Sequence, residues 1–82
     1  MTYAILFERM SENDGPAGSF YAHIPALDLT THGDGIDGAR TAALDLLKLW
    51  IVEKRSAGET VPHPTEFLFS TVEIPDDALQ GA

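Results

Sequence analysis

Residues 33–58 constrain the fold most strongly, because their apolar side chains recur at steps of three and four, as on one side of a helix. About 20 helical residues at about 1.5 Å each make a rod of roughly 30 Å. A rod of this length is long for a small chain, so the remaining segments must cover its apolar stripe. The stripe consists of Ile36, Ala39, Ala43, Leu46, Leu47, Trp50 and Ile51.

The ends of this predicted helix carry residues that suit helix termini. Asp34 is placed to act as the N-cap, and Asp37 can return the bond in a variant of the capping box. Lys54 and Arg55 fall in the last turn, where positive charge suits the helix dipole. Gly58 then offers the left-handed conformation that ends many helices, so we expect the helix to stop there.

Length and composition predict one small domain that gains stability by association. The chain has 82 residues and no cysteine, which excludes disulfides and thiolate metal sites. A chain of this size buries only about 60–65% of its unfolded surface. We therefore expect a homodimer or a higher homo-oligomer, in which a second copy supplies extra burial.

Charge limits the classes of partner. Thirteen acidic and five basic residues give a formal net charge of −8. Phosphate binding needs clustered lysine and arginine, so we expect no direct contact with nucleic acid. The charge favours a basic protein partner, although it would also serve solubility alone. No apolar run is long enough to cross a bilayer and the first residues lack a basic signal-peptide start, so we expect a cytoplasmic protein without a membrane partner.

Four segments are predicted to be strands from their β-prone, alternating residues. The first is apolar on both faces, which predicts a central position in the sheet. The second alternates as a half-buried strand and ends at Pro25, whereas the third is poor in apolar residues and suits an edge. The four strands are expected at residues 3–8, 19–24, 28–32 and 66–74.

The resulting element order is β-β-β-α-β, an α+β fold. Three antiparallel strands form a meander, the helix crosses one face, and the last strand pairs parallel to the first through a right-handed connection. With the first strand central, the mixed four-stranded sheet has the order 3-2-1-4. Residues 61–64 contain two prolines and form an extended connector before the last strand.

The order and spacing of several segments resemble the HicB-like antitoxin family. The resemblance covers residues 3–75, and no single motif in it is specific by itself. The matching segments are Tyr3-Ala4-Ile5-Leu6-Phe7-Glu8, Ile24-Pro25-Ala26-Leu27, the Gly33-Asp34 pair before the helix, Gly58-Glu59, and the prolines Pro62 and Pro64. Members of the family have a partial ribonuclease H fold of the same β-β-β-α-β order.

The resemblance implies a single HicB-like domain over residues 1–82, with its core at 3–75 and a frayed tail at 76–82. It further implies a non-enzymatic antitoxin-type protein that masks the catalytic surface of a small basic HicA-type mRNA-cleaving toxin. Full-length members continue into a DNA-binding module, and we expect none within these residues. The alternative is a stand-alone oligomeric scaffold or small-ligand-binding protein without a toxin.

Residues that could carry catalysis or bind a metal are present but scattered. Two-metal nuclease chemistry on a ribonuclease H-like fold needs carboxylates that converge on ions about 4 Å apart. The available acids have no evident common focus: Glu8, Asp37, Asp45 and Glu73. The three histidines, His23, His32 and His63, lack the spacing of metal ligands. We therefore expect no catalytic residue, no metal and no cofactor.

Two sets of residues are candidates for contact with other proteins. Tyr21, His23 and His32 fall on the predicted open face of the sheet, where they give a mixed aromatic and polar surface. Leu49 and Val52 lie outside the apolar stripe of the helix, which makes them candidates for an oligomer interface. Exposed apolar residues are also common on ordinary surfaces, and this reading stays open for both sets.

Overall fold

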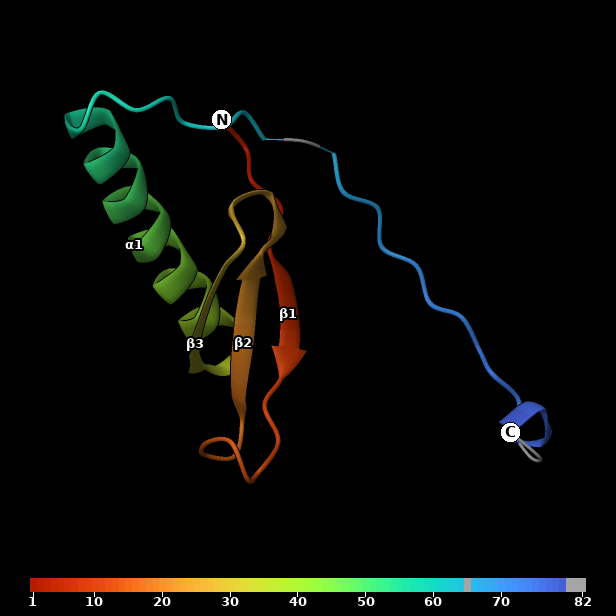
Figure 1. The fold of residues 1–82 in the computed structure, drawn as a ribbon. Coiled ribbons are helices and arrows are strands. Elements are labelled where there is room, and N and C mark those ends of the chain that lie inside the picture. The colour runs from red at the N-terminus through yellow and green to blue at the C-terminus, as the bar shows by residue number, and fades with distance from the viewer. Residues whose placement is uncertain (65, 80–82) are drawn as a thin grey trace.

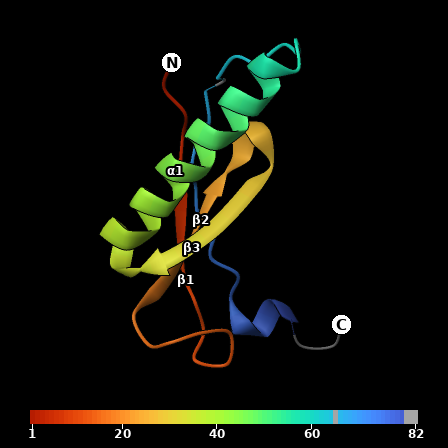
Figure 2. The ribbon, with the colours of Figure 1, turned by 90° about the vertical axis from the view of Figure 1, so that its left-hand side faces the viewer.

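The computed structural model describes residues 1–64 and 66–79 and has an α+β architecture with one sheet and one long helix (Figure 1). The helix crosses one face of the sheet (Figure 2). The strands are β1 (Leu6–Arg9), β2 (Ser19–Ile24) and β3 (Leu29–Asp34), followed by the helix α1 (Gly35–Ser56). Two short 3-10 helices are η1 (Pro25–Leu27) and η2 (Asp76–Leu79).

The sheet is an antiparallel meander in the order β1-β2-β3. The predicted four-stranded sheet with the order 3-2-1-4 is not observed in the described residues, because residues 66–74 are extended without forming a strand there. An extended segment becomes a strand only when its backbone pairs with a neighbour. The first strand therefore lies at an edge of this sheet, not at the predicted central position.

The strand boundaries follow the sequence in part. The second strand has the predicted bounds, and Pro25 opens the 3-10 helix that follows it. The first strand begins at Leu6, although its apolar pattern starts at residue 3. The third strand extends to Asp34, which the sequence assigned to the start of the helix. Its predicted place at an edge is confirmed.

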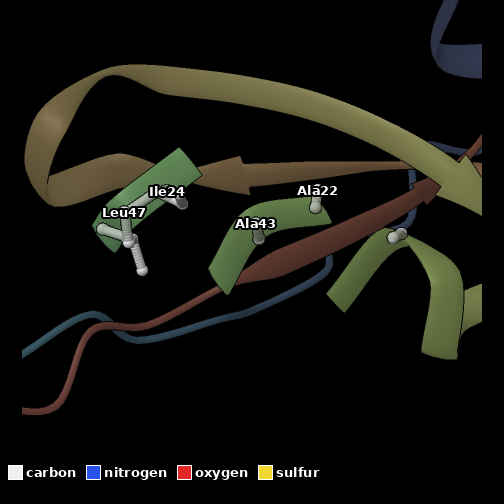
Figure 3. Close-up of a cluster of buried hydrophobic side chains, with 5 residues drawn as sticks. Ala22, Ile24, Ala43 and Leu47 are labelled. Carbon is white, nitrogen blue, oxygen red and sulfur yellow. The ribbon is translucent and has the colours of Figure 1, made fainter. Parts of the chain in front are cut away.

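The core lies between α1 and the face of the sheet that it covers (Figure 3). Ala22 and Ile24 of β2 are fully buried against Ala39, Ala43 and Leu47 of the helix. This confirms the central part of the predicted apolar stripe. Small side chains at two of the three helix positions allow a close approach to the sheet, which leaves room for few large residues in the core.

The first turn of α1 does not follow the predicted stripe or the predicted capping. Ile36 is 46% exposed. Asp34 occupies the N-cap position as the last residue of β3, and its side chain makes no capping bond. The N–H of Gly35 instead donates to the carbonyl of Gly18 at 2.8 Å. A bond to the turn before β2 thus satisfies one of the free N–H groups at the start of the helix.

Gly33 is required where β3 meets the first turn of α1. A Cβ atom at this position would lie 2.4 Å from the carbonyl carbon of Gly38 and 2.5 Å from the amide nitrogen of Ala39. Both contacts are with backbone atoms, which cannot rotate away as a side chain can. The absence of a side chain on Gly33 therefore sets how closely the helix packs on the sheet.

The helix ends as predicted. Ala57 is the C-cap residue, and Gly58 has a φ of +73°, the left-handed conformation expected of it. The N–H of Glu59 donates to the carbonyl of Lys54 at 2.9 Å, and the side chains of the same two residues form an ion pair at 2.9 Å. The left-handed glycine thus ends α1 and turns the chain away from the helix.

After α1 the chain returns to the N-terminal segment and then leaves the rest of the molecule. The hydroxyl of Tyr3 donates to the carbonyl of Pro62 at 3.0 Å, and beyond this point the chain runs outward on the side of β1 away from α1 (Figure 1). We call residues 66–74 the arm. Of the predicted frayed tail, residues 76–79 form η2 and residues 80–82 lie outside the described part.

The arm makes the molecule elongated. The radius of gyration is 16.6 Å and the principal extents are 54 × 29 × 19 Å. A compact domain of 82 residues would have a radius of gyration of about 12 Å. No described helix combines the length and apolar character needed to span a membrane.

Candidate functional site

The alternation of side chains along β2 divides the sheet into a covered face and an open face. Ala22 and Ile24 point to the helix and are fully buried. Successive strand residues point to opposite faces, so Tyr21 and His23 lie on the other side. We call this second side the open face, because α1 covers the first.

The register of the sheet brings the three predicted contact residues together on the open face. Tyr21 of β2 lies opposite His32 of β3, and the rings of Tyr21 and His23 are stacked with their centroids 5.8 Å apart. His32 is exposed, whereas the two residues of β2 are half-buried. The structure thus places all three on one surface, and their role as partner contacts stays a prediction.

Two further residues fix the ring of His23. Its Nε2 lies 2.9 Å from Oε1 of Glu8 on β1, and its Nδ1 lies 3.0 Å from the hydroxyl oxygen of Thr30 on β3. An ionised carboxylate only accepts hydrogen bonds, so Nε2 donates to Glu8, and in the neutral ring Nδ1 accepts from Thr30. Both ring nitrogens are therefore engaged within the sheet.

The sequence did not identify Glu8 and Thr30 as members of this cluster. Both lie opposite residues of β2 in the sheet register, Glu8 opposite Tyr21 and Thr30 opposite His23. A cross-strand pair can be predicted only when the register is known, and the turn between the first two strands is too long to fix it. The open face is therefore a polar and aromatic surface that spans three strands and holds the ring of His23 by two hydrogen bonds.

Of the residues considered for catalysis and metal binding, Glu8, His23 and His32 lie in or beside this cluster, and the other four lie elsewhere. His63 lies in the connector, Asp37 and Asp45 lie on α1, and Glu73 lies in the arm. Among the described residues, no group of three or more His, Cys, Asp or Glu side chains is placed to hold a metal ion. No pocket is found in the described part of the chain.

The predicted oligomer residues are on the outer side of α1. Leu49 is 58% and Val52 59% exposed, so neither belongs to the core between α1 and the sheet. On another side of the helix, Lys54 extends over the ring of Trp50, with its Nζ 5.4 Å from the ring centroid. The structure thus agrees with the helical-wheel placement, and the role of Leu49 and Val52 in assembly stays a prediction.

The arm is the largest apolar feature that the structure leaves uncovered. Leu68 is 88%, Phe69 79% and Val72 84% exposed, and Phe67 and Ile74 are exposed as well. The sequence assigned these residues to the fourth strand of the sheet. The segment from residue 59 onward is also acidic and holds no lysine or arginine; its acids are Glu59, Glu66, Glu73, Asp76 and Asp77. It therefore combines apolar side chains with negative charge.

No family model, no curated protein and no solved structure matches this chain.

Proposed function

We propose that this chain is a non-enzymatic, HicB-like antitoxin-type domain that binds a small basic HicA-type mRNA-cleaving toxin and sterically masks it. The observation that carries the proposal is the open face, where Tyr21, His23 and His32 form a prearranged surface on a protein of net charge −8. A rigid surface loses little side-chain entropy on binding, and the charge accelerates encounter with a basic protein. Such a complex would form in the cytoplasm, where mRNA is cleaved.

The proposal includes a fourth strand in the sheet. In the functional form, an arm, from the same chain or from a second copy, adds to the outer edge of β1 as a parallel fourth strand and gives the order 3-2-1-4. The arm supports this because its residues favour strands and expose apolar side chains that a sheet would cover. The HicB-like resemblance implies the same element order.

The second candidate is a stand-alone oligomeric scaffold or small-ligand-binding protein without a toxin. The exposed apolar residues of the arm and the outer side of α1 favour a scaffold, because large uncovered apolar surfaces mark sites of association. The two candidates differ in the partner they require. The antitoxin needs a different, basic protein, whereas the scaffold needs only further copies of itself.

The deciding experiment is co-expression with any small basic reading frame adjacent to the gene. We expect a stable complex and restored growth of cells that express the toxin. Replacing Tyr21 and His32 by alanine should weaken the complex at least about tenfold, since truncated interface aromatics commonly cost this much or more. His63→Ala, in the connector, serves as the control with unchanged affinity.

Three outcomes would contradict parts of the proposal. A complex that forms equally well with the double variant would move the contact away from the open face. The lack of any growth rescue and of an adjacent basic reading frame would leave the scaffold as the better candidate. Metal-dependent RNA cleavage by the purified chain alone would overturn the non-enzymatic assignment.

A further inference from the structure

The outer edge of β1 has backbone groups ready to pair with another strand. Hydrogen bonds of an antiparallel strand alternate between its two edges. The N–H of Met10 donates to the carbonyl of Ser19 at 2.9 Å, so Met10 is a residue whose backbone bonds toward β2. By alternation, the backbone groups of Glu8 also point toward β2, and those of Phe7 and Arg9 point to the outer edge. Within residues 1–64 and 66–79, no strand pairs with this outer edge. We call it the free edge.

The arm has the composition of a strand that lacks a neighbour. Five of its nine residues are apolar and exposed: Phe67, Leu68, Phe69, Val72 and Ile74. Its residues are β-branched or aromatic at most of these positions, which favours pairing in a sheet. A free sheet edge can pair with an extended apolar segment, and this chain contains both.

The path of the chain directs the arm away from its own free edge. Pro62 is bonded to Tyr3 beside the start of β1, and from there the arm extends outward beyond β1 (Figure 1). Pro62 and Pro64 stiffen the connector in an extended form, because proline fixes φ near −65° and lacks an N–H. A stiff connector that projects a strand outward favours its exchange between identical chains.

Charge also matches the arm to the free edge. Of the five basic residues of the chain, one lies on β1 and another lies over a ring of β1, and both arginines contact an aromatic ring. The guanidinium carbon of Arg9 is 4.8 Å from the ring centroid of Phe20, and that of Arg40 is 5.8 Å from that of Phe7. The segment that would lie against them is acidic and holds no basic residue. Local attraction therefore offsets the repulsion between two acidic chains.

We propose that two copies of this chain exchange arms, the arm of each pairing in parallel with the free edge of the other. Each sheet then has four strands, one of them from the partner, and is incomplete without it. The exchange pairs the backbone of each arm with a free edge and covers the apolar side chains on one face of each arm. This proposal does not depend on the antitoxin function, because it concerns contacts between identical chains.

The first test measures the mass of the full chain in solution by light scattering or sedimentation. We expect a dimer, and we expect Leu68→Asp with Val72→Asp to weaken it at least about 100-fold, because two buried apolar side chains become charged. Both side chains are exposed in the isolated chain, so the variant should still fold. Leu49→Asp with Val52→Asp adds the same charge on α1 and should leave the dimer intact.

The second test addresses the free edge. Arg9→Pro removes an outward N–H without breaking a bond to β2, and it should abolish the dimer. Arg9→Ala loses the same side chain but keeps the N–H, so it should dimerise with an affinity reduced by less than about tenfold. A 1:1 mixture of the Arg9→Pro and Leu68→Asp/Val72→Asp variants should form a heterodimer, because one intact edge can still accept one intact arm.

Each alternative has its own signature. A monomeric wild type at all accessible concentrations would overturn the exchange and indicate an arm that stays free or folds onto its own edge. A dimer that persists in Arg9→Pro but is lost in Leu49→Asp/Val52→Asp would overturn it in favour of contact through α1. Equal weakening by Arg9→Ala and Arg9→Pro would show that side-chain charge, not strand pairing, holds the copies together.

Discussion

The helix–sheet body and the arm contain similar side chains but occupy opposite environments. In the body, formed by β1–β3 and α1, Ala22 and Ile24 alternate with polar residues and are fully buried. In the arm, residues 66–74 are at least as apolar and remain exposed. The difference is the presence of a partner surface: α1 covers β2, whereas no described element covers the arm. An apolar pattern therefore shows that a segment requires a covering surface, and the topology decides whether the same chain provides that surface.

The largest effect should come from the core of the body. Ile24→Ala should lower the free energy of unfolding by about 2–5 kcal/mol, because a fully buried side chain leaves a cavity. Phe69→Ala in the arm should act only through dimerisation, so its effect should disappear on dilution. Denaturant unfolding at several protein concentrations measures both. A loss from Ile24→Ala that varies strongly with concentration would contradict the separation of body and arm.

A smaller effect should follow from the close approach of β3 to α1. Gly33→Ala should cost about 1–3 kcal/mol, because its Cβ would meet backbone atoms. Gly38→Ala is the matched control: its Cβ would be 3.6 Å or more from its nearest neighbours, and alanine should add up to about 1 kcal/mol to the stability of the helix. Thermal unfolding would measure both changes. Two changes of the same sign would contradict this account of the contact.

The smallest effect concerns the junction between the two regions. Glu59→Gln breaks the ion pair with Lys54, whose side chains are 54% and 38% exposed, so the loss should be below about 0.5 kcal/mol. The loss should vanish in about 1 M salt, where the screening length is about 3 Å. Chemical unfolding with and without salt provides the measurement. A large loss that persists in high salt would mean that this junction stabilises the body through more than charge.

The body could be predicted from the sequence because its signals are local. The helical period placed α1, and alternation with Pro25 placed β2 at its observed bounds. Burial of Ala39, Ala43 and Leu47 followed from the same period. The missing side-chain bond at Asp34 did not follow, because residue type predicts the N-cap position but not whether the side chain bonds there.

The candidate site and the arm needed information that local patterns do not hold. Alternation placed Tyr21 and His23 on one face, but the bonds to Glu8 and Thr30 depend on the register of three strands. The strand predicted at residues 66–74 has suitable residues, yet a strand is defined by its neighbour. When the neighbouring strand belongs to a second copy, the structure of a single chain shows the segment without its pairing.

The hydrogen bond between Tyr3 and Pro62 places the first residues beside the connector that leads into the arm. A fusion partner or purification tag joined to Met1 would therefore crowd this connector. Tyr3→Phe would remove the hydrogen bond to Pro62 while keeping the aromatic ring. The proposed exchange of arms would thus be sensitive to changes in the first residues, and samples intended for studies of association should leave them unaltered.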